Sequence, residues 1–171
     1  MEVDDFYGLK PYISFFDESN IPAVARLIVS DTSMGIPMGV YAFIEFFCVD
    51  PDCDCRKTSI QVIDEASKTV MASIHYGWES EEYYTDLFGE DKYTNPKEGL
   101  SLEPMQQQSK YSNKFLDIFE MKLNSDEEYR MSIEEHYYDT KFRVKEMTTA
   151  LEEKKASKAI PSFRKKRFRT R

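Results

Sequence analysis

Hydrophobic positions in the first half of the chain follow the two-residue period of β-strands, interrupted by short polar turns. Residues 40–49 form an almost continuous aromatic and β-branched run, which predicts a strand buried on both faces. Segments 56–64 and 69–78 alternate apolar and polar residues, and turn sequences at 50–52 and 65–68 separate the three segments. This pattern predicts an antiparallel meander of three strands.

The segments around this meander predict shorter elements. Residues 1–20 mix aromatic residues with turn formers, which predicts an irregular or partly helical start. Segment 22–30 is short and apolar, and its β-branched residues favour a fourth strand. Ser80 predicts the N-terminal cap of a short helix that ends near Phe88. Residues 90–108 are polar and rich in turn formers, so we predict a long loop there.

The second half of the chain changes to helical periodicity. Apolar residues recur every three or four positions over 109–123, which predicts a helix. Ser125 and Glu128 match a capping box, so we predict a second helix that runs to about Glu153. Two consecutive helices after a meander predict an α+β fold, in which an αα-hairpin packs on an antiparallel sheet of three or four strands.

Length and composition are typical of one globular domain. The chain has 171 residues, of which 41% are hydrophobic and 14% aromatic. Its net charge of −8 is unevenly distributed, because residues 154–171 contain nine Lys or Arg and no acid, which leaves 14 basic and 31 acidic residues before them. We therefore predict a single domain over residues 1–153 and a flexible basic tail over residues 154–171.

The sequence also bears on the cellular compartment. No apolar run is long enough to span a bilayer, and residues 1–5 are acidic, unlike a secretory signal or a transit peptide. We therefore expect a cytoplasmic protein. Clustered cysteines stay reduced in that compartment, where metal binding or redox chemistry is commoner than a disulfide.

The three cysteines, Cys48, Cys53 and Cys55, fall within eight residues around the first predicted turn. Cys48 ends one predicted strand, and Cys53 and Cys55 begin the next, so the three sulfurs can converge across the hairpin. Thiolates are soft ligands that suit Zn²⁺, which takes four donors in a tetrahedron. The spacing therefore predicts a zinc site that clamps the first two strands.

Two histidines are candidates for the fourth ligand. If the second turn places Ile63 opposite Val70, Thr58 lies opposite His75, which brings His75 to the cysteine end of the sheet. His136 is the alternative, if its helix packs over that end. Four protein ligands would close the site, as is typical of structural rather than catalytic zinc.

Other interpretations of the cysteine segment compete with zinc. Free cysteines are often buried, so these thiols can be ordinary core residues. A redox pair of Cys53 and Cys55 is disfavoured, because it would close a small strained ring and no thioredoxin-like βαβ pattern surrounds it. The interleaved Asp50, Asp52 and Asp54 invite a hard-cation site, but the glycine and distal glutamate of a calcium loop are missing.

The basic tail is the candidate nucleic-acid interface. Its lysines and arginines are interleaved with two phenylalanines, a pattern that can bind RNA, DNA or an anionic membrane. The acidic remainder of the chain repels phosphates, and the tail can instead fold back on it. The candidate nucleic-acid-binding residues are Arg164, Lys165, Lys166, Arg167, Arg169 and Arg171.

A metal-dependent enzyme is a further alternative, in which the metal keeps an open position near Glu134, Glu135 or His136. The order of these residues does not match the zincin motif, and the chain has no Gly-rich phosphate loop or nucleophile elbow. We therefore assign no catalytic residue from the sequence.

Segments 46–56 and 74–78, which hold the cysteine hairpin and the run Ile-His-Tyr-Gly-Trp, resemble a set of uncharacterised prokaryotic proteins. Some of those proteins carry a short Cys-rich metal-binding tail of the SEC-C type, whereas the C-terminal residues of this chain are basic and contain no Cys. The resemblance implies metal binding and no particular activity. We expect a small cytosolic, zinc-stabilised binding or adaptor protein with a protein partner, with nucleic-acid association through the tail and metal-dependent catalysis as the alternatives.

Overall fold

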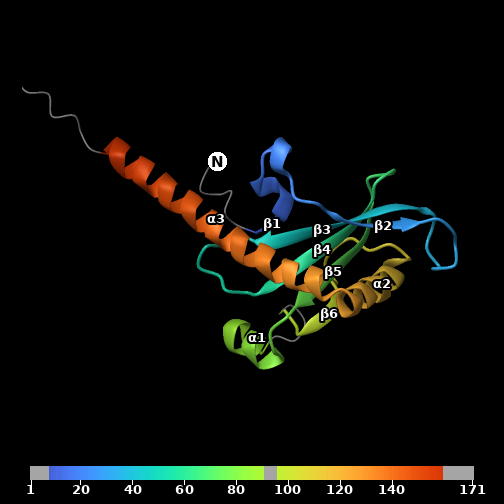
Figure 1. The fold of residues 1–171 in the computed structure, drawn as a ribbon. Helices are drawn as coiled ribbons and strands as arrows, with labels where there is room; N and C mark the ends of the chain where they lie inside the picture. The colour runs from blue at the N-terminus through green and yellow to red at the C-terminus, as the bar shows by residue number, and fades with distance from the viewer. Residues whose placement is uncertain (1–7, 91–95, 160–171) are drawn as a thin grey trace, which may run out of the picture.

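The computed structural model describes residues 8–90 and 96–159, which adopt the predicted α+β fold (Figure 1). A six-stranded antiparallel sheet forms one layer, with the order β1-β3-β4-β5-β6 and with β2 beside β3. The described residues also form three α-helices, of which the two C-terminal ones pack against the sheet. The sheet is therefore larger than the predicted meander of three or four strands.

The centre of the sheet is the predicted meander. It consists of β3 (Gly39–Cys48), β4 (Lys57–Asp64) and β5 (Val70–Gly77), joined by short turns. Strand β3 is rich in aromatic and β-branched residues, which pack well on a pleated surface. The alternation of β4 and β5 directs one set of side chains into the main core.

The remaining strands lie at the two edges of the sheet. Strands β1 (Leu9–Pro11) and β2 (Ala25–Val29) pair with successive parts of the same edge of β3. Strand β6 (Gly99–Leu102) pairs with β5 and lies in the segment for which we predicted only a loop. The strand in segment 22–30 is confirmed, whereas β1 and β6 are too short to show a period in the sequence.

A β-bulge between Val62 and Ile63 changes the register of β4 against β5. Ile63 pairs with Val70, as we predicted, but the other pairs shift by one residue, so that Ser59 rather than Thr58 lies opposite His75. A bulge inserts one extra residue into one strand and has no clear signature in this sequence.

The α-helices begin and end at recognisable signals. Helix α1 (Glu81–Phe88) begins after Ser80, whose side chain accepts a hydrogen bond from the amide of Tyr83, as predicted. Helix α2 spans Ser112–Ser125 and α3 spans Glu127–Ala159. The predicted capping box at Ser125 is wrong, because Asp126 accepts the hydrogen bond from the Tyr129 amide at 2.9 Å.

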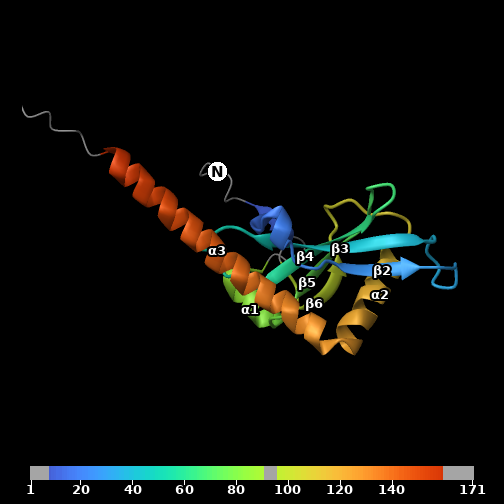
Figure 2. The same ribbon diagram turned by 45° about the horizontal axis from the view of Figure 1, so that its top comes forward.

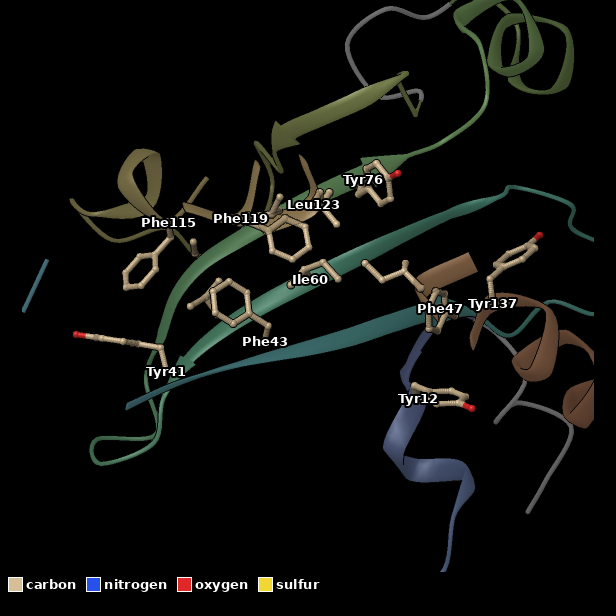
Figure 3. Close-up of a cluster of buried hydrophobic side chains, with 14 of the residues drawn as sticks. Tyr12, Tyr41, Phe43, Phe47, Ile60, Tyr76, Phe115, Phe119, Leu123 and Tyr137 are labelled. Atoms are coloured by element: carbon tan, nitrogen blue, oxygen red, sulfur yellow. The ribbon is translucent and has the colours of Figure 1, made fainter. Parts of the chain in front are cut away.

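The main core lies between the sheet and α2 with the first half of α3, and it is rich in aromatic side chains (Figure 3). Phe43 of β3 stacks on Phe119 of α2 with ring centroids 5.5 Å apart. Phe47 at the other end of β3 meets Tyr137 of α3 edge to face. This end of the core adjoins the cysteine segment.

Helix α3 is the longest element, with 33 residues, and its second half projects away from the sheet (Figures 1 and 2). Its last residues, 154–159, belong to the segment in which we predicted a flexible tail, and they are helical. None of the helices in the two described ranges combines the length and apolarity needed to cross a membrane.

Candidate metal centre

The three cysteines converge where β3 leaves the sheet. Cys48 is the last residue of β3, and Cys53 and Cys55 lie in the connection to β4, not in the strand itself as we predicted. Their three sulfur atoms all lie within 4.8 Å of one another. The three cysteines therefore lie close enough together to hold a metal ion.

The turn between them is built from local hydrogen bonds. Asp50 accepts a hydrogen bond from the Asp52 amide through its carboxylate, at 3.0 Å, and one from the Cys53 amide through its carbonyl, at 3.3 Å. This Asx-type turn reverses the chain, as the sequence Asp-Pro-Asp predicts. It brings Cys53 back towards Cys48.

Arg56 fixes the return of the chain into β4. Its backbone is in the left-handed region, with φ of 41°, which is uncommon for a residue other than glycine. Its guanidinium donates to Asp54 at 2.9 Å and to Glu79 at 3.0 Å, and its carbonyl accepts from the Tyr84 hydroxyl at 2.7 Å. These contacts hold the unusual conformation directly after Cys55.

Two helices hold the cysteine segment from outside. Tyr83 of α1 donates to the carbonyl of Asp54 at 2.6 Å, and Tyr137 of α3 donates to its carboxylate at 3.2 Å. Lys141 of α3 donates through its ammonium group to the carbonyl of Asp50 at 2.8 Å. The connection between β3 and β4 is therefore fixed by residues far away in the sequence.

The electrostatic environment distinguishes the three thiols. A hydrogen bond from Cys55, reinforced by the Asp50 amide and the Lys141 ammonium, lowers the pKa of the Cys48 thiol to about 5. The hydrogen bond to Cys48 and burial raise the pKa of Cys55 far above its usual range, and burial raises the pKa of Cys53. Cys48 is therefore the most readily ionised of the three thiols, and the thiolate is the form that binds metals.

Burial differs across the cluster. Cys55 is 1% exposed and belongs to the main core, whereas Cys48 and Cys53 are half-buried. All three are free thiols. A metal ion here would be shielded by the core on one side and accessible to solvent on the other.

The structure does not bring His75 to the cysteines. Its neighbours Ile74 and Tyr76 point into the main core, to which Cys55 also belongs, so alternation directs the imidazole to the opposite face of β5. Its Nε2 lies 2.8 Å from the carbonyl oxygen of Lys97 and 3.2 Å from the amide nitrogen of that residue. The prediction placed His75 by its position along the sheet, which the shift of register changes by only one residue, and did not consider the face of β5 on which it lies.

His136 is also engaged elsewhere. Its Nδ1 lies 2.6 Å from the carboxylate of Glu45, and its ring stacks on Tyr12 with centroids 4.1 Å apart. Among the described residues, the only group of His, Cys, Asp and Glu side chains that converges for a metal consists of the three cysteines. The aspartates of the turn therefore form no hard-cation site, and neither histidine belongs to the cluster.

The contribution of α1 and α3 to this site was missed from the sequence. Lys141 is one of many charged residues on an amphipathic helix, and nothing in its spacing connects it with Asp50, which lies 91 residues earlier. The ion pair of Asp54 and Arg56 could have been predicted from the sequence, because these two opposite charges flank Cys55.

The chain matches no protein-family model, no curated protein and no solved structure. The resemblance to prokaryotic proteins with the same cysteine hairpin therefore stays a prediction. The candidate nucleic-acid-binding residues from Arg164 to Arg171 lie outside the described residues.

Proposed function

We propose that this protein binds one Zn²⁺ through Cys48, Cys53 and Cys55, and that the ion has a structural role in a small binding or adaptor protein. The convergence of the three sulfurs within 4.8 Å carries this proposal. Tetrahedral zinc with Zn–S bonds of about 2.3 Å places its sulfur ligands about 3.8 Å apart, so only small side-chain movements are required.

The surrounding residues support a structural role. Polar groups of the cysteine segment and of the helices beside it, on Asp54, Tyr83 and Tyr137, are occupied in hydrogen bonds that hold the loop. The ion would link the end of β3 to the start of β4 at a point that α1 and α3 also contact. The fourth ligand would come from outside the three cysteines, and a structural role requires it to be a protein group, such as a side chain of a binding partner, because a solvent ligand is typical of catalytic zinc.

A binding role is supported by the shape of the molecule. Helix α3 extends beyond the sheet (Figure 2). Its side chains from Glu152 to Ser157 are exposed. A metal that stiffens the connection facing α3 would help to hold this helix in a fixed direction.

The proposal is tested by the zinc content of protein purified without added metal. We expect about one zinc per chain, and a melting temperature about 10 °C lower after chelation, because a tightly bound ligand stabilises the folded state. Cys53→Ser, at a half-exposed position, should lose most of the zinc. The matched variants His75→Gln and His136→Gln should retain it.

Protein with no bound metal and no loss of stability in chelator would refute the metal centre. One equivalent of copper or iron instead of zinc would overturn the identity of the metal. Loss of zinc in His75→Gln at unchanged folding would contradict the three-cysteine ligand set.

A further inference from the structure

Cys48 and Cys53 differ from Cys55 in their access to solvent. Cys55 is 1% exposed and packs in the main core, whereas the other two cysteines are half-buried. Pro51 and Asp52, which lie between the two half-buried cysteines, are exposed. A small solute therefore reaches the sulfurs of Cys48 and Cys53 more readily than the sulfur of Cys55.

The turn between Cys48 and Cys53 brings these two side chains together. Asp50 accepts hydrogen bonds from the amides of Asp52 and Cys53, at 3.0 and 3.3 Å, and the cysteine sulfurs lie within 4.8 Å of one another. A disulfide needs a sulfur–sulfur distance of about 2.05 Å. Because the turn is exposed, rotation of these two side chains can supply the remaining movement without displacing the core.

A disulfide that includes Cys55 is less favourable. One residue separates Cys53 from Cys55, so a disulfide between them would close a small, strained ring. Cys55 is also held in place, by the core around it and by Arg56, which pairs with Asp54 at 2.9 Å and with Glu79 at 3.0 Å. Its sulfur is therefore less free to move towards either partner.

We propose that hydrogen peroxide oxidises Cys48 and Cys53 to a reversible disulfide. The sulfur of one cysteine attacks an oxygen of the peroxide, the O–O bond breaks, and a sulfenic acid and one water form. The sulfur of the other cysteine then attacks the sulfenic sulfur, so that the S–S bond forms, the S–O bond breaks and a second water leaves. Two thiols thereby lose two electrons and two protons, which reduce one hydrogen peroxide to two waters.

This disulfide regulates the metal centre, and that part of the inference rests on the proposed function. The oxidation removes two of the three sulfur ligands, so Cys55 alone remains and zinc leaves. In the chain by itself, no His, Cys, Asp or Glu of the described residues joins the three cysteines, so peroxide can reach the sulfurs beside a bound ion. Reduction of the disulfide by a dithiol restores the ligands.

Peroxide treatment of the full chain, purified with its metal, tests the inference. Free thiols are alkylated after the treatment, and a protease that cleaves before aspartate then places each cysteine on a separate peptide, because Asp50 and Asp54 separate the three cysteines. Mass spectrometry should find Cys48 joined to Cys53. A zinc-sensitive dye should record the loss of one zinc for each disulfide formed, and dithiothreitol should reverse both changes.

Cys55→Ala is the matched variant, since it keeps the two partly exposed cysteines and should form the same disulfide. Cys53→Ser should form no disulfide. The peptide map of the wild type identifies the pair even where a variant does not fold.

A disulfide that includes Cys55, oxidation to sulfinic acid without a disulfide, or no reaction would overturn the inference. Zinc that stays bound after the disulfide has formed would overturn the regulatory role. Protein that is isolated without zinc and still forms the disulfide between Cys48 and Cys53 would refute the proposed zinc centre and confirm the disulfide.

Discussion

Lys141 is the residue through which α3 acts most directly on the cysteine cluster. Its ammonium group holds the Asp50 carbonyl at 2.8 Å and its positive charge lowers the pKa of Cys48. Three thiolates around one divalent ion carry a net negative charge, and a nearby cation stabilises that charge. Lys141 is thus a positioning residue for the proposed centre.

We predict that Lys141→Met weakens zinc binding about tenfold or more, the usual effect of removing a group that supports metal ligands. The number of ions per chain stays at one, because all three sulfurs remain. Competition with a zinc-sensitive chelator measures the affinity. Lys155→Met is the matched control on the same helix, and equal affinities in the two variants would contradict the role of Lys141.

His75 is a buried histidine that is neutral in the folded protein. It is 7% exposed, and burial lowers its pKa to about 4. The unfolded chain binds a proton at this residue below pH 6.5, whereas the folded chain does so only near pH 4. The folded state therefore has its full stability from the neutral His75 above pH 6.5, and this contribution to the free energy of unfolding is lost as the pH falls towards 4.

We predict that His75 contributes about 3 kcal/mol to the fall in the free energy of unfolding between pH 6.5 and 4. Urea unfolding of the wild type and of His75→Gln, both in chelator, measures the difference between their pH profiles. The glutamine variant, which does not titrate, should show the shallower fall. Parallel pH profiles for the wild type and His75→Gln would contradict this prediction, because they would show that His75 has the same pKa in the folded and the unfolded chain.

Element boundaries depend on single side chains that the sequence pattern does not fully specify. Apolar periodicity predicted α2 and α3 correctly, but their junction is set by Asp126, which caps α3 and also pairs with Lys122 at 3.1 Å. Asp and Ser are both good N-terminal caps, so Ser125 and Asp126 are equal candidates in sequence. Only the geometry of the junction distinguishes them.

We predict that Asp126→Ala lowers the melting temperature by about 3 °C, whereas Ser125→Ala has little effect. Asp126→Asn keeps a side-chain oxygen at the cap and should retain most of the stability. Calorimetry of the three variants measures these shifts. A larger loss in Ser125→Ala than in Asp126→Ala would contradict the assigned cap.

The β4–β5 hairpin shows why strand register limits the prediction of a site. The three strands of the meander follow from their alternation and turns, and the pairing of Ile63 with Val70 is confirmed. One bulge next to that pair shifts all the others by one residue, so the cross-strand partner of His75 is Ser59 rather than Thr58. His75 lies away from the cysteines because alternation along β5 places Ile74 and Tyr76 in the core and His75 on the opposite face.

At the scale of the whole molecule, the sequence predicted the α+β class, the central meander and the packing of the C-terminal helices on the sheet. These features follow from long periodic segments. The convergence of Cys48, Cys53 and Cys55 could also be predicted from the sequence, because one turn connects them. The contacts of α1 and α3 with the cysteine segment did not follow, since they join residues that are distant in the chain.

The central claim is that the three sulfurs hold one zinc ion. X-ray absorption at the zinc edge of the purified protein tests it most directly. The proposed zinc centre predicts three sulfur ligands at about 2.3 Å with one lighter oxygen or nitrogen ligand, and one sulfur fewer in Cys53→Ser. Zinc surrounded only by oxygen and nitrogen, or a purified protein without zinc, would contradict this account.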